Sequence, residues 1–239
     1  MDYIMETVST VELAKEQLNQ WIDNGMIGAG GKLPSERELS ELLGIKRMTL
    51  RQALLNLEGE SKIFRKDRRG WFVALPRFNY NPNEATSYKQ AAIEQGRVPS
   101  WGYLEKQRVL DAPPRMQSLL QADPQQGLFR IRGWGALDGH KVFYHETYIN
   151  PLVAPDFIDH LGESAFADVW SQHYQRPTVT RHLAFKPTRL NAEASRVIGG
   201  NCTTPAIQVE KFRADMLRNI LQIDIEYWRF ESVDFYIDL

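Results

Sequence analysis

The sequence predicts an α+β protein of two domains, and three observations support this. Residues 9–60 carry apolar side chains at helical spacing in three successive segments, and an alternating hairpin pattern follows. A Pro/Asn-rich stretch without periodicity comes next, and beyond it strand-like runs outnumber helical ones. We therefore expect an N-terminal domain over residues 1–75, a linker over residues 76–85, and an α+β domain with a mostly antiparallel sheet over residues 86–239.

The composition excludes several classes of protein. Of the 239 residues, 43% are hydrophobic and 25% are charged, which is the profile of a globular chain. The single cysteine, Cys202, rules out an internal disulfide framework, and the five histidines show no metal-ligand spacing, so we expect neither a metal nor a cofactor. No apolar run approaches the ~18 residues of a membrane span, and no signal-peptide pattern opens the chain. We therefore expect a cytoplasmic protein without a membrane partner.

Capping residues mark the starts of the first two helices. Ser9 or Thr10 precedes the first helix, and Ser35 with Glu38 forms a capping box at the start of the second, which Gly44 ends. The third helix follows after a short turn. The apolar residues that we expect the three helices to bury are Val11, Leu13, Ala14, Leu18, Trp21, Ile22, Leu39, Leu42, Leu43, Leu50, Ala53, Leu54 and Leu57.

A basic hairpin follows the three helices. Residues 62–66 and 70–75 alternate as two strands joined by the turn "DRRG", so the whole segment predicts a winged helix-turn-helix. Residues 44–70 hold eight basic and three acidic side chains, whereas residues 1–43 hold three basic and eight acidic ones, in a chain of net charge −1. This positive block is either the electrostatic footprint of a DNA partner or a solvated basic face.

The first turns of the third helix carry side chains suited to reading DNA. An α-helix fits the major groove and directs the side chains of its first turns at base edges. Those turns present Arg47, Thr49 and Arg51, while Arg37 on the preceding helix is placed for a backbone phosphate. Arginine can bond guanine bidentately or hold a phosphate, and threonine can meet thymine or a phosphate.

The hairpin turn completes the predicted DNA reader. The apolar residues 71–73 would anchor the hairpin on the helices, and Gly70 permits a tight turn. Arg68 and Arg69 would then reach phosphates or the minor groove. The alternative interpretation of this turn is a solvated loop.

These segments together resemble a known family. "LPSERELSELLGIKRMTLRQALLNLE" followed by "RRGWFV" resembles the signature of the GntR family of bacterial transcription factors, over about the first third of the chain. The resemblance implies a homodimer on a pseudo-palindromic, double-stranded DNA operator. By the same resemblance, the family's DNA-contacting positions fall on Arg37, Arg47, Thr49, Arg51 and Gly70.

One position departs from the family's pattern. Lys46 stands where the family usually has a small hydroxyl residue that caps the recognition helix, which is the third helix here. The departure removes a cap and adds a cation beside the DNA.

The strand-rich second half resembles the UTRA ligand-binding domain of the HutC subfamily, whose fold is similar to chorismate lyase. The segments that carry this resemblance are "LDGHKVFYHETYI", "SAFADVW" and "IEYWRFES". "DRRGWFV", "EQGR", "HLAFKPT" and "DIEYWR" together resemble the regulators of 2-aminoethylphosphonate utilisation. The expected effector is therefore a small anion or zwitterion, with 2-aminoethylphosphonate as the specific candidate.

An anionic group on the effector would need N–H donors. A helix opens just past the linker with Ser87 or Thr86 as its cap, and the amides of Tyr88 and Lys89 fall where UTRA domains hold anionic groups. In "SAFADVW", Ser164 matches a serine that similar regulators use for the same group, and Phe166 lies beside it. A simple N-cap role would explain both serines without any ligand.

Cations for this group are harder to assign. Phosphosugar-sensing relatives carry two arginines at positions that align with Gly133 and Gly135. Arg130 and Arg132 lie just upstream, but their parity puts them on the opposite strand face unless Gly133 forms a bulge. The two arginines therefore either bind the effector or lie exposed.

An ammonium group on the effector would need a carboxylate. Glu146 matches a ligand-binding glutamate of the subfamily. In the last strand, Gln222, Asp224 and Glu226 share one face by the strand period of two, and Trp228 on that face favours a pocket over solvent.

Two functions from different classes remain open. The first is a ligand-responsive, DNA-binding transcriptional regulator. The second is an enzyme of chorismate lyase-like fold that acts on a small anion and uses its N-terminal domain only for assembly. We expect no catalytic residues, because no nucleophile elbow, metal triad or P-loop is present, and an enzyme has no need of an arginine-bearing wing.

Overall fold

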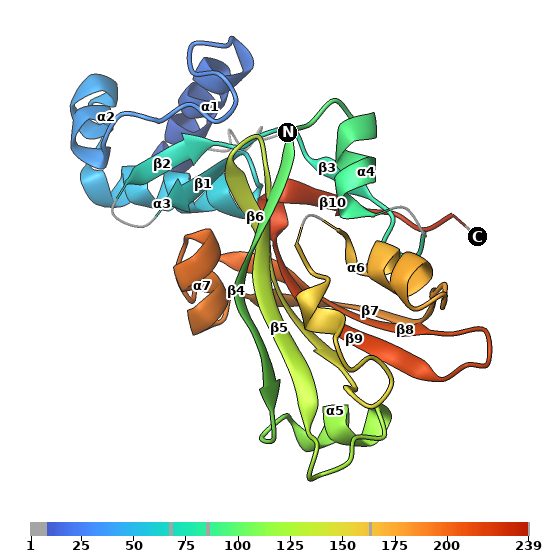
Figure 1. Cartoon of the computed structure of the whole chain (residues 1–239). Coiled ribbons are helices and arrows are strands. Elements are labelled where there is room, and N and C mark those ends of the chain that lie inside the picture. The colour runs from blue at the N-terminus through green and yellow to red at the C-terminus, as the bar shows by residue number, and fades with distance from the viewer. Residues whose placement is uncertain (1–8, 67–68, 85–86, 163, 239) are drawn as a thin grey trace, which may run out of the picture. The chain divides into compact units, whose positions relative to one another are not determined.

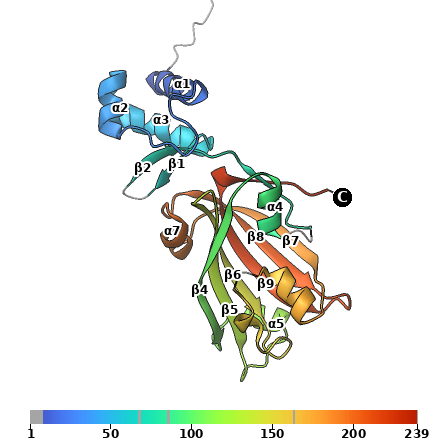
Figure 2. The same cartoon turned by 45° about the horizontal axis from the view of Figure 1, so that its top comes forward.

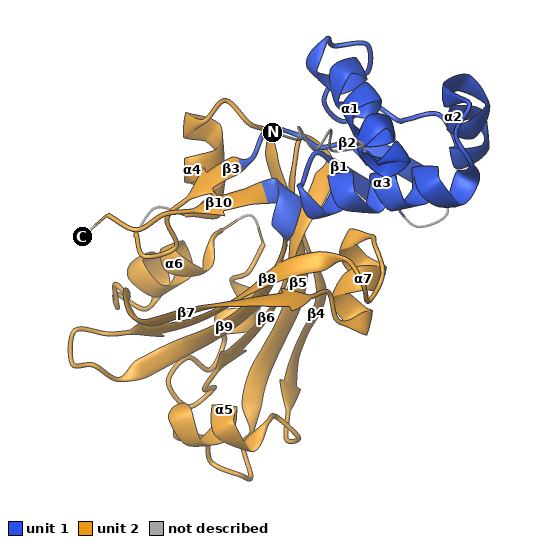
Figure 3. Ribbon diagram, turned by 180° about the vertical axis from the view of Figure 1, so that it is seen from behind, with its two compact units in different colours: residues 1–77, 230–232 blue, residues 78–229, 233–239 orange. Residues whose placement is uncertain are grey.

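The structure, a computed structural model, describes residues 9–66, 69–84, 87–162 and 164–238 (Figure 1). The chain forms two compact units, which Figure 3 separates by colour. Unit 1 comprises Met1–Arg77 with Phe230–Ser232, and unit 2 comprises Phe78–Arg229 with Val233–Leu239. No helix among the described residues is long and apolar enough to cross a membrane.

Unit 1 is the predicted set of three helices and a hairpin. Its elements are α1 (Thr10–Asp23), α2 (Glu36–Leu43), α3 (Arg47–Gly59), β1 (Ile63–Lys66) and β2 (Gly70–Val73). The predicted caps are confirmed. Ser9 caps α1, and Ser35 with Glu38 forms the capping box of α2. Gly44 ends α2 with a φ of 64°, a conformation that glycine adopts without strain.

The three helices and the hairpin share one core. Its fully buried residues are Leu18, Leu33, Leu39, Leu50, Leu54, Leu57, Ile63, Trp71 and Val73. The prediction was wrong for Leu13 and Leu42, whose exposed fractions are 47% and 67%. The short helix α2 contacts the core through Leu39 and Leu43, which lie one turn apart on the same face of the helix. Leu42 lies to the side of this face and is therefore exposed.

Unit 2 is built on one six-stranded antiparallel sheet, in the order β4-β5-β6-β9-β8-β7 (Figure 1, Figure 2). The predicted α+β fold with a mostly antiparallel sheet is therefore confirmed. The sheet strands are β4 (Pro99–Val109), β5 (Leu128–Leu137), β6 (His140–Ile149), β7 (Val179–Arg189), β8 (Pro205–Ala214) and β9 (Ile220–Arg229). The helical segments are α4 (Tyr88–Glu94), α5 (Pro114–Leu119), η1 (Phe157–Asp159), α6 (Phe166–Asp168), η2 (Val169–His173) and α7 (Ala192–Ile198).

The last strand of the sheet, β9, is followed by a 3-10 turn, η3 (Phe230–Ser232), after which β10 (Val233–Phe235) pairs in parallel with β3 (Phe78–Tyr80). The alternation of apolar residues is interrupted inside this turn, where Glu231 and Ser232 are two consecutive polar residues. Residues 166–173 form a short α-helical turn, α6, that continues as one π-helical turn, η2.

The two faces of the sheet pack against different elements. On one side, which we call the α4 face, Phe143, Val209 and Trp228 pack with β3, β10 and α4. On the other side, the α7 face, Tyr144 and Ala206 pack with α7. Because successive strand residues alternate between faces, this division decides which polar side chains can meet a ligand.

Candidate functional site

The start of α3 carries a cluster of exposed cations. Lys46, Arg47 and Arg51 are exposed, and Thr49 is half-buried. Lys46 occupies the N-cap position and makes no side-chain capping bond, as its departure from the family's pattern implied. Within the described residues, none of the three cations has an ion pair or a side-chain hydrogen bond.

This arrangement is electrostatically unfavourable for an isolated helix. A helix N-terminus carries partial positive charge, so it favours acidic residues. The helices α1 and α2 follow this rule, with Glu12 in the first turn of one and Glu36 and Glu38 in that of the other. The first turn of α3 has no acidic residue and has basic ones in their place. A phosphate backbone would supply the missing negative charge.

The remaining predicted DNA contacts are also exposed. Arg37 lies on the surface of α2 and forms an exposed pair with Glu41, at 3.6 Å. Arg69 is exposed at the hairpin turn, and Gly70 has a φ of 99°, which only glycine adopts readily. Arg68 lies outside the described residues.

Two exposed residues beside this surface were not predicted. Met48, in the first turn of α3, has 77% of its surface exposed and could touch a thymine methyl group. Lys32 precedes α2, pairs with β2 opposite Phe72 and passes close to Gly70, so it adds a cation beside the wing. The sequence could have identified Met48, because it lies two positions before the core residue Leu50 and so on the opposite side of the helix. Lys32 could not be identified in this way, because only its tertiary pairing with β2 brings it beside the wing.

Unit 2 contains a cavity of about 140 Å³ against the α4 face of the sheet. The lining residues are Tyr80, Ser87, Tyr88, Lys89, Trp101, Tyr103, Trp134, Phe143, His145, Thr147, Ser164, Ala165, Phe166, Ala167, Lys211, Arg213, Gln222, Asp224 and Glu226. Six residues expected to bind the effector are among them: Tyr88, Lys89, Ser164, Phe166, Gln222 and Asp224.

The two serines at the cavity have different roles. The hydroxyl of Ser87 accepts the Gln90 amide at 3.2 Å, so this serine caps α4. At α6 the N-cap is Ala165, whose amide donates to the Asp168 carboxylate at 3.2 Å. Ser164 is exposed and makes no hydrogen bond within the described residues. The N-cap explanation therefore accounts for Ser87 and leaves the Ser164 hydroxyl for another partner.

A chain of hydrogen bonds fixes the carboxylate of Asp224 at the floor of the cavity. The indole N–H of Trp170 donates to Gln222 Oε1 at 2.8 Å, and Gln222 Nε2 donates to both oxygens of Asp224, at 2.7 and 2.9 Å. The hydroxyl of Thr147 donates to Asp224 Oδ1 at 2.8 Å. This carboxylate is buried and oriented before any ligand arrives.

His145 continues the chain as a neutral imidazole. Its Nδ1 lies 3.2 Å from the Thr147 hydroxyl, which has already given its proton to Asp224. Nδ1 must therefore carry the hydrogen, which leaves Nε2 as an acceptor. Burial lowers the pKa of His145, against the raising effect of Asp224 and Glu226, so the ring is uncharged at neutral pH.

A second carboxylate of the cavity is neutralised within the protein. Lys211 Nζ donates to Glu226 Oε1 at 3.0 Å, and the Trp228 indole donates to Glu226 Oε2 at 2.7 Å. Burial acts against both charges, but their mutual attraction outweighs it: the pKa of Glu226 is lowered and that of Lys211 is raised. Both groups are charged at neutral pH, and each neutralises the charge of the other.

Arg213 is the exception among the buried charges. Only 7% of its surface is exposed, and it lines the cavity on the same face of β8 as Lys211. Within the described residues no acidic side chain pairs with it and no hydrogen bond holds its guanidinium. A buried, unpaired cation is costly, so one that faces a cavity marks a place for an anion.

Gly133 and Gly135 lie on the cavity side of β5, but aromatic rings of β6 fill the space above them. A Cβ at Gly133 would come within 2.6 Å of His145 Nε2, and one at Gly135 would enter the ring of Phe143. The resemblance to phosphosugar-sensing regulators placed a pair of arginines at these two positions. An arginine pair has no room here, so any cation for an anionic ligand must come from another strand.

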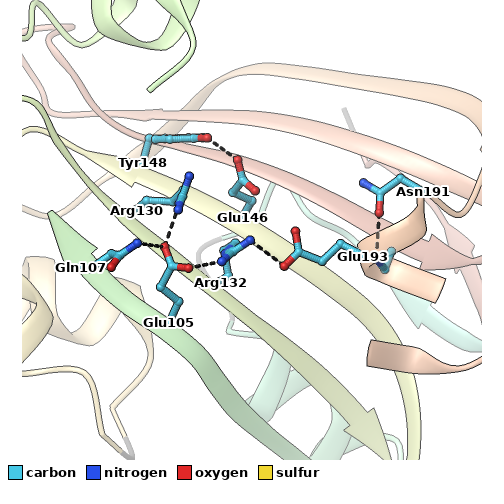
Figure 4. Close-up of polar contacts among 9 residues, drawn as sticks. Glu105, Gln107, Arg130, Arg132, Glu146, Tyr148, Asn191 and Glu193 are labelled. Carbon is cyan, nitrogen blue, oxygen red and sulfur yellow. Dashed lines mark hydrogen bonds and ion pairs between the residues drawn. The ribbon is translucent and has the colours of Figure 1, made fainter. Parts of the chain in front are cut away.

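Glu146, Arg130 and Arg132, which the sequence offered as effector ligands, lie on the α7 face of the sheet (Figure 4) and do not line this cavity. Arg130 Nε donates to Glu105 Oε1 at 2.8 Å. Arg132 pairs with Glu105 and, at 2.6 Å, with Glu193 of α7.

The Tyr148 hydroxyl donates to Glu146 on this same face. The bulge that could have turned the arginines falls on β4, between Tyr103 and Glu105, and not at Gly133. These side chains form an ion-pair network that supports the sheet.

Cross-strand register identifies the residues that the sequence missed. Glu146 of β6 lies opposite Ile225 of β9, whereas Thr147 lies opposite Asp224 and His145 opposite Glu226. Residues directly opposite in an antiparallel pair share a face. Because Asp224 was already assigned to the cavity, the register alone would have selected His145 and Thr147 and excluded Glu146. The register of β8 against β9 would likewise have identified the cavity residues Lys211 and Arg213, which lie opposite Asp224 and Gln222.

The arrangement defines a class of protein. A three-helix unit with a wing presents unpaired cations for a nucleic acid, and a separate sheet unit encloses a cavity with a fixed carboxylate and an unpaired buried arginine. This is a transcriptional regulator that senses a small molecule. Comparisons with known proteins identify the family.

Residues 10–73 match the bacterial regulatory proteins of the gntR family, and residues 94–234 match the UTRA domain. The uncharacterized HTH-type transcriptional regulator YihL of Escherichia coli K12 is 61% identical over 234 residues, which cover 98% of this chain and 99% of YihL. The HTH-type transcriptional regulator GgaR of the same organism is 26% identical over 90% of this chain and 84% of its own. The crystal structure of PhnF from Mycobacterium smegmatis shares the fold, with a TM-score of 0.63 and 18% identity over 95% of this chain and 98% of PhnF.

The chain belongs to the GntR family of bacterial transcriptional regulators and carries a UTRA domain. GntR regulators bind DNA, and UTRA domains bind small-molecule effectors. The named relatives are transcriptional regulators, so the alternative of an enzyme with an assembly module is set aside.

Proposed function

We propose that this regulator responds to a small zwitterion that carries an anionic group at one end and an ammonium at the other, with 2-aminoethylphosphonate as the specific candidate. It binds a pseudo-palindromic operator as a homodimer, with one DNA reader on each half-site. The observation that carries the effector assignment is the pairing, in one small cavity, of an unpaired buried arginine with a fixed buried carboxylate.

Arg213 supports the anionic end of the ligand. A phosphonate would neutralise its guanidinium and could accept two parallel N–H bonds from it. Two further donors line the same cavity: the Ser164 hydroxyl and Lys89, whose Nζ lies over the Trp101 ring at 5.2 Å. The amides at the start of α4, at Tyr88 and Lys89, are the remaining expected donors. The Tyr88 hydroxyl donates to the Ala136 carbonyl at 2.6 Å and so anchors α4 to the sheet.

Asp224 and His145 support the ammonium end. The hydrogen bonds to the Asp224 carboxylate come from neutral donors; its ion pair with Lys211 Nζ is long, at 3.9 Å, because that ammonium donates to Glu226. His145 Nε2 is an acceptor at the same end of the hydrogen-bond chain. An ammonium would satisfy both groups. This role was expected of Glu146, which the strand register removes from the cavity.

The charge and size of the cavity fit a compact anion or zwitterion. Its ionised lining residues are three cations (Lys89, Lys211 and Arg213) and two anions (Asp224 and Glu226). One positive charge is therefore left over, which matches a phosphonate with more negative charge than its ammonium cancels. A volume of about 140 Å³ is below the ~300 Å³ at which pockets for drug-sized ligands begin.

A melting-temperature titration of the full chain tests this assignment. 2-Aminoethylphosphonate should raise the melting temperature in proportion to the logarithm of its concentration. Ethylphosphonate lacks the ammonium and should act only at much higher concentration, and a hexose 6-phosphate should do little because its binding arginines are absent. Tight binding of the hexose phosphate with no response to 2-aminoethylphosphonate would overturn the assignment and leave the DNA-binding function intact.

Two matched carboxylate variants locate the ammonium. Asp224→Asn keeps the shape of the side chain and its bond from Thr147, but it removes the charge, so the response to 2-aminoethylphosphonate should fall by at least about tenfold in affinity. Glu146→Gln makes the same chemical change on the opposite face of the same sheet and should leave the response unchanged. Equal losses in the two variants would contradict the placement of the ammonium at Asp224.

The homodimer has its own measurement. Sedimentation of the full chain with and without a palindromic operator should give a dimer on the DNA, with two chains per duplex. One chain per duplex on a complete operator would contradict the proposed arrangement of half-sites.

A further inference from the structure

Three potential metal ligands converge on the surface of unit 2, apart from the cavity. They are Asp156, His160 and His173, and one ligand atom from each lies within 4.8 Å of the other two. His160 Nε2 is 3.0 Å from Asp156 Oδ2, and His173 Nε2 is 3.5 Å from the same oxygen. Their side chains are 36% to 49% exposed, so an ion could reach them from solvent.

The fold creates this cluster, and sequence spacing does not reveal it. Asp156 and His160 flank the 3-10 turn η1, and His173 lies at the end of the π-helical turn η2. The two turns are held together by apolar contacts beneath the cluster, where the Phe157 ring packs on Trp170 at 4.8 Å and on Tyr174 at 5.9 Å. The two imidazole rings are consequently close together, with their centres 3.5 Å apart and their planes tilted by 34°.

The spacing of the ligand atoms suits a tetrahedral ion. Zinc binds imidazole nitrogen and carboxylate oxygen at about 2.0–2.2 Å, which places neighbouring ligand atoms roughly 3.3 Å apart. The two Nε2 to Oδ2 separations, 3.0 and 3.5 Å, bracket this value. The Tyr174 hydroxyl donates to the other oxygen of Asp156 and so orients the carboxylate from behind, as outer partners of metal ligands do.

We propose that Asp156, His160 and His173 form a binding site for a divalent transition metal of the zinc type. Imidazole and carboxylate ligands favour such an ion over magnesium or calcium, which prefer sites made of oxygen alone. Three protein ligands leave a fourth position for water. The site joins two turns that are separate in the sequence, so the bound ion closes a loop and stabilises the segment.

The position of the site gives it a consequence for the cavity. Ser164, Ala165 and Phe166 belong to the segment between the two metal-binding turns, and all three line the cavity. Trp170, in η2, donates to Gln222, which in turn holds Asp224. An ion that fixes η1 to η2 therefore orders one wall of the cavity before a ligand binds.

Zinc titration of the full chain tests the site. The protein should carry no polyhistidine tag, be treated with a chelator first, and carry Cys202→Ser throughout, because an exposed thiol is itself a zinc ligand. We expect one Zn²⁺ per chain by calorimetry, and a rise in the melting temperature of the wild type when the ion is added. His160→Ala and His173→Ala should each weaken zinc binding by at least about tenfold.

A third histidine provides a matched control. His182 is 42% exposed and pairs with Glu210 at 3.1 Å, so it resembles His173 in exposure and in its single carboxylate partner. His182→Ala should bind zinc like the wild type. Stoichiometric zinc binding that persists in the double variant His160→Ala/His173→Ala would overturn the proposal, as would a wild type that binds no zinc. Either result would show that the cluster is only a set of hydrogen bonds around Asp156.

Discussion

Units 1 and 2 present their functional side chains in opposite ways. In unit 1, Arg47 and Arg51 lie exposed on a single helix and have no partner within the described residues. In unit 2, Asp224 and Glu226 are buried, and each is held by hydrogen bonds from neighbouring side chains. A cation in water costs little to leave unpaired, whereas a buried charge needs a partner. The DNA-binding side chains of unit 1 are therefore solvated and unpaired before DNA binds, whereas the polar side chains of the cavity in unit 2 are already held in place before a ligand binds.

Arg213 is the residue that breaks this rule in unit 2. It is as buried as its neighbours but lacks their partners within the described part of the chain. Burial of an unpaired charge opposes folding, and a bound anion would recover that free energy. We therefore expect that variants of the DNA contacts leave the free energy of unfolding unchanged. Removal of the unpaired charge from the cavity should raise the free energy of unfolding and weaken ligand binding.

The largest expected effect is on DNA binding. Arg47→Ala and Arg51→Ala should each cost about 1–3 kcal/mol of operator affinity and relax specificity at one base position. Because both side chains are exposed, the melting temperature and its response to effector should not change. Gel-shift titrations on a set of operator variants measure this. A uniform loss across all variants would assign these arginines to phosphates and not to bases.

The second effect separates stability from binding. Arg213→Gln removes the unpaired buried charge, so the ligand-free protein should become more stable by about 1 kcal/mol. The same variant should lose the effector-dependent rise in melting temperature. Denaturant unfolding with and without ligand measures both. A destabilised ligand-free variant would mean that Arg213 has a partner within the protein and is not available to bind an anion.

The wing should contribute affinity without specificity. Arg69→Ala, alone or with Arg68→Ala, should weaken binding to all DNA sequences alike and flatten the log–log salt dependence by about 0.9 for each phosphate that the variant no longer neutralises. Lys62→Ala is the control, since Lys62 precedes the first strand of the same hairpin, at the end away from the turn. An unchanged salt slope in the wing variants would place the turn away from DNA.

The smallest effect is a pH dependence that originates in the cavity. Burial lowers the pKa of His145, so the unfolded chain binds its proton more readily than the folded one. Stability is therefore full above the unfolded pKa of about 6.5 and falls as the pH drops below it, by at most about 1.4 kcal/mol per pH unit. His145→Asn should show a shallower decline between pH 7.5 and 5.5 in denaturant unfolding. Identical slopes would assign the decline to other groups.

The contrast between the units also explains what the sequence could predict. The capping box of α2, the exposed cations of α3 and the buried leucines of α3 (Leu50, Leu54 and Leu57) all follow from spacing within one helix, and the structure confirms them. Strand parity likewise placed Gln222 and Asp224 together at the cavity. These features depend only on local periodicity.

The errors occurred where position depends on a partner strand. Glu146 was assigned to the effector, although its register against Ile225 turns it away. Arg213 and His145 were missed because their importance comes from side chains contributed by other strands. The metal-ligand cluster of unit 2 was missed for the same reason, since tertiary packing alone brings η1 and η2 together. A single sequence carries no direct record of such pairings.

The most direct test of this division of roles is calorimetric titration of 2-aminoethylphosphonate into the full-length wild type, Arg47→Ala and Arg213→Gln proteins. We expect equal binding by the wild type and Arg47→Ala, with at least about a tenfold loss of affinity for Arg213→Gln. Binding by Arg213→Gln that equals that of the wild type would contradict the claim that the unpaired buried arginine holds the anionic group of the effector.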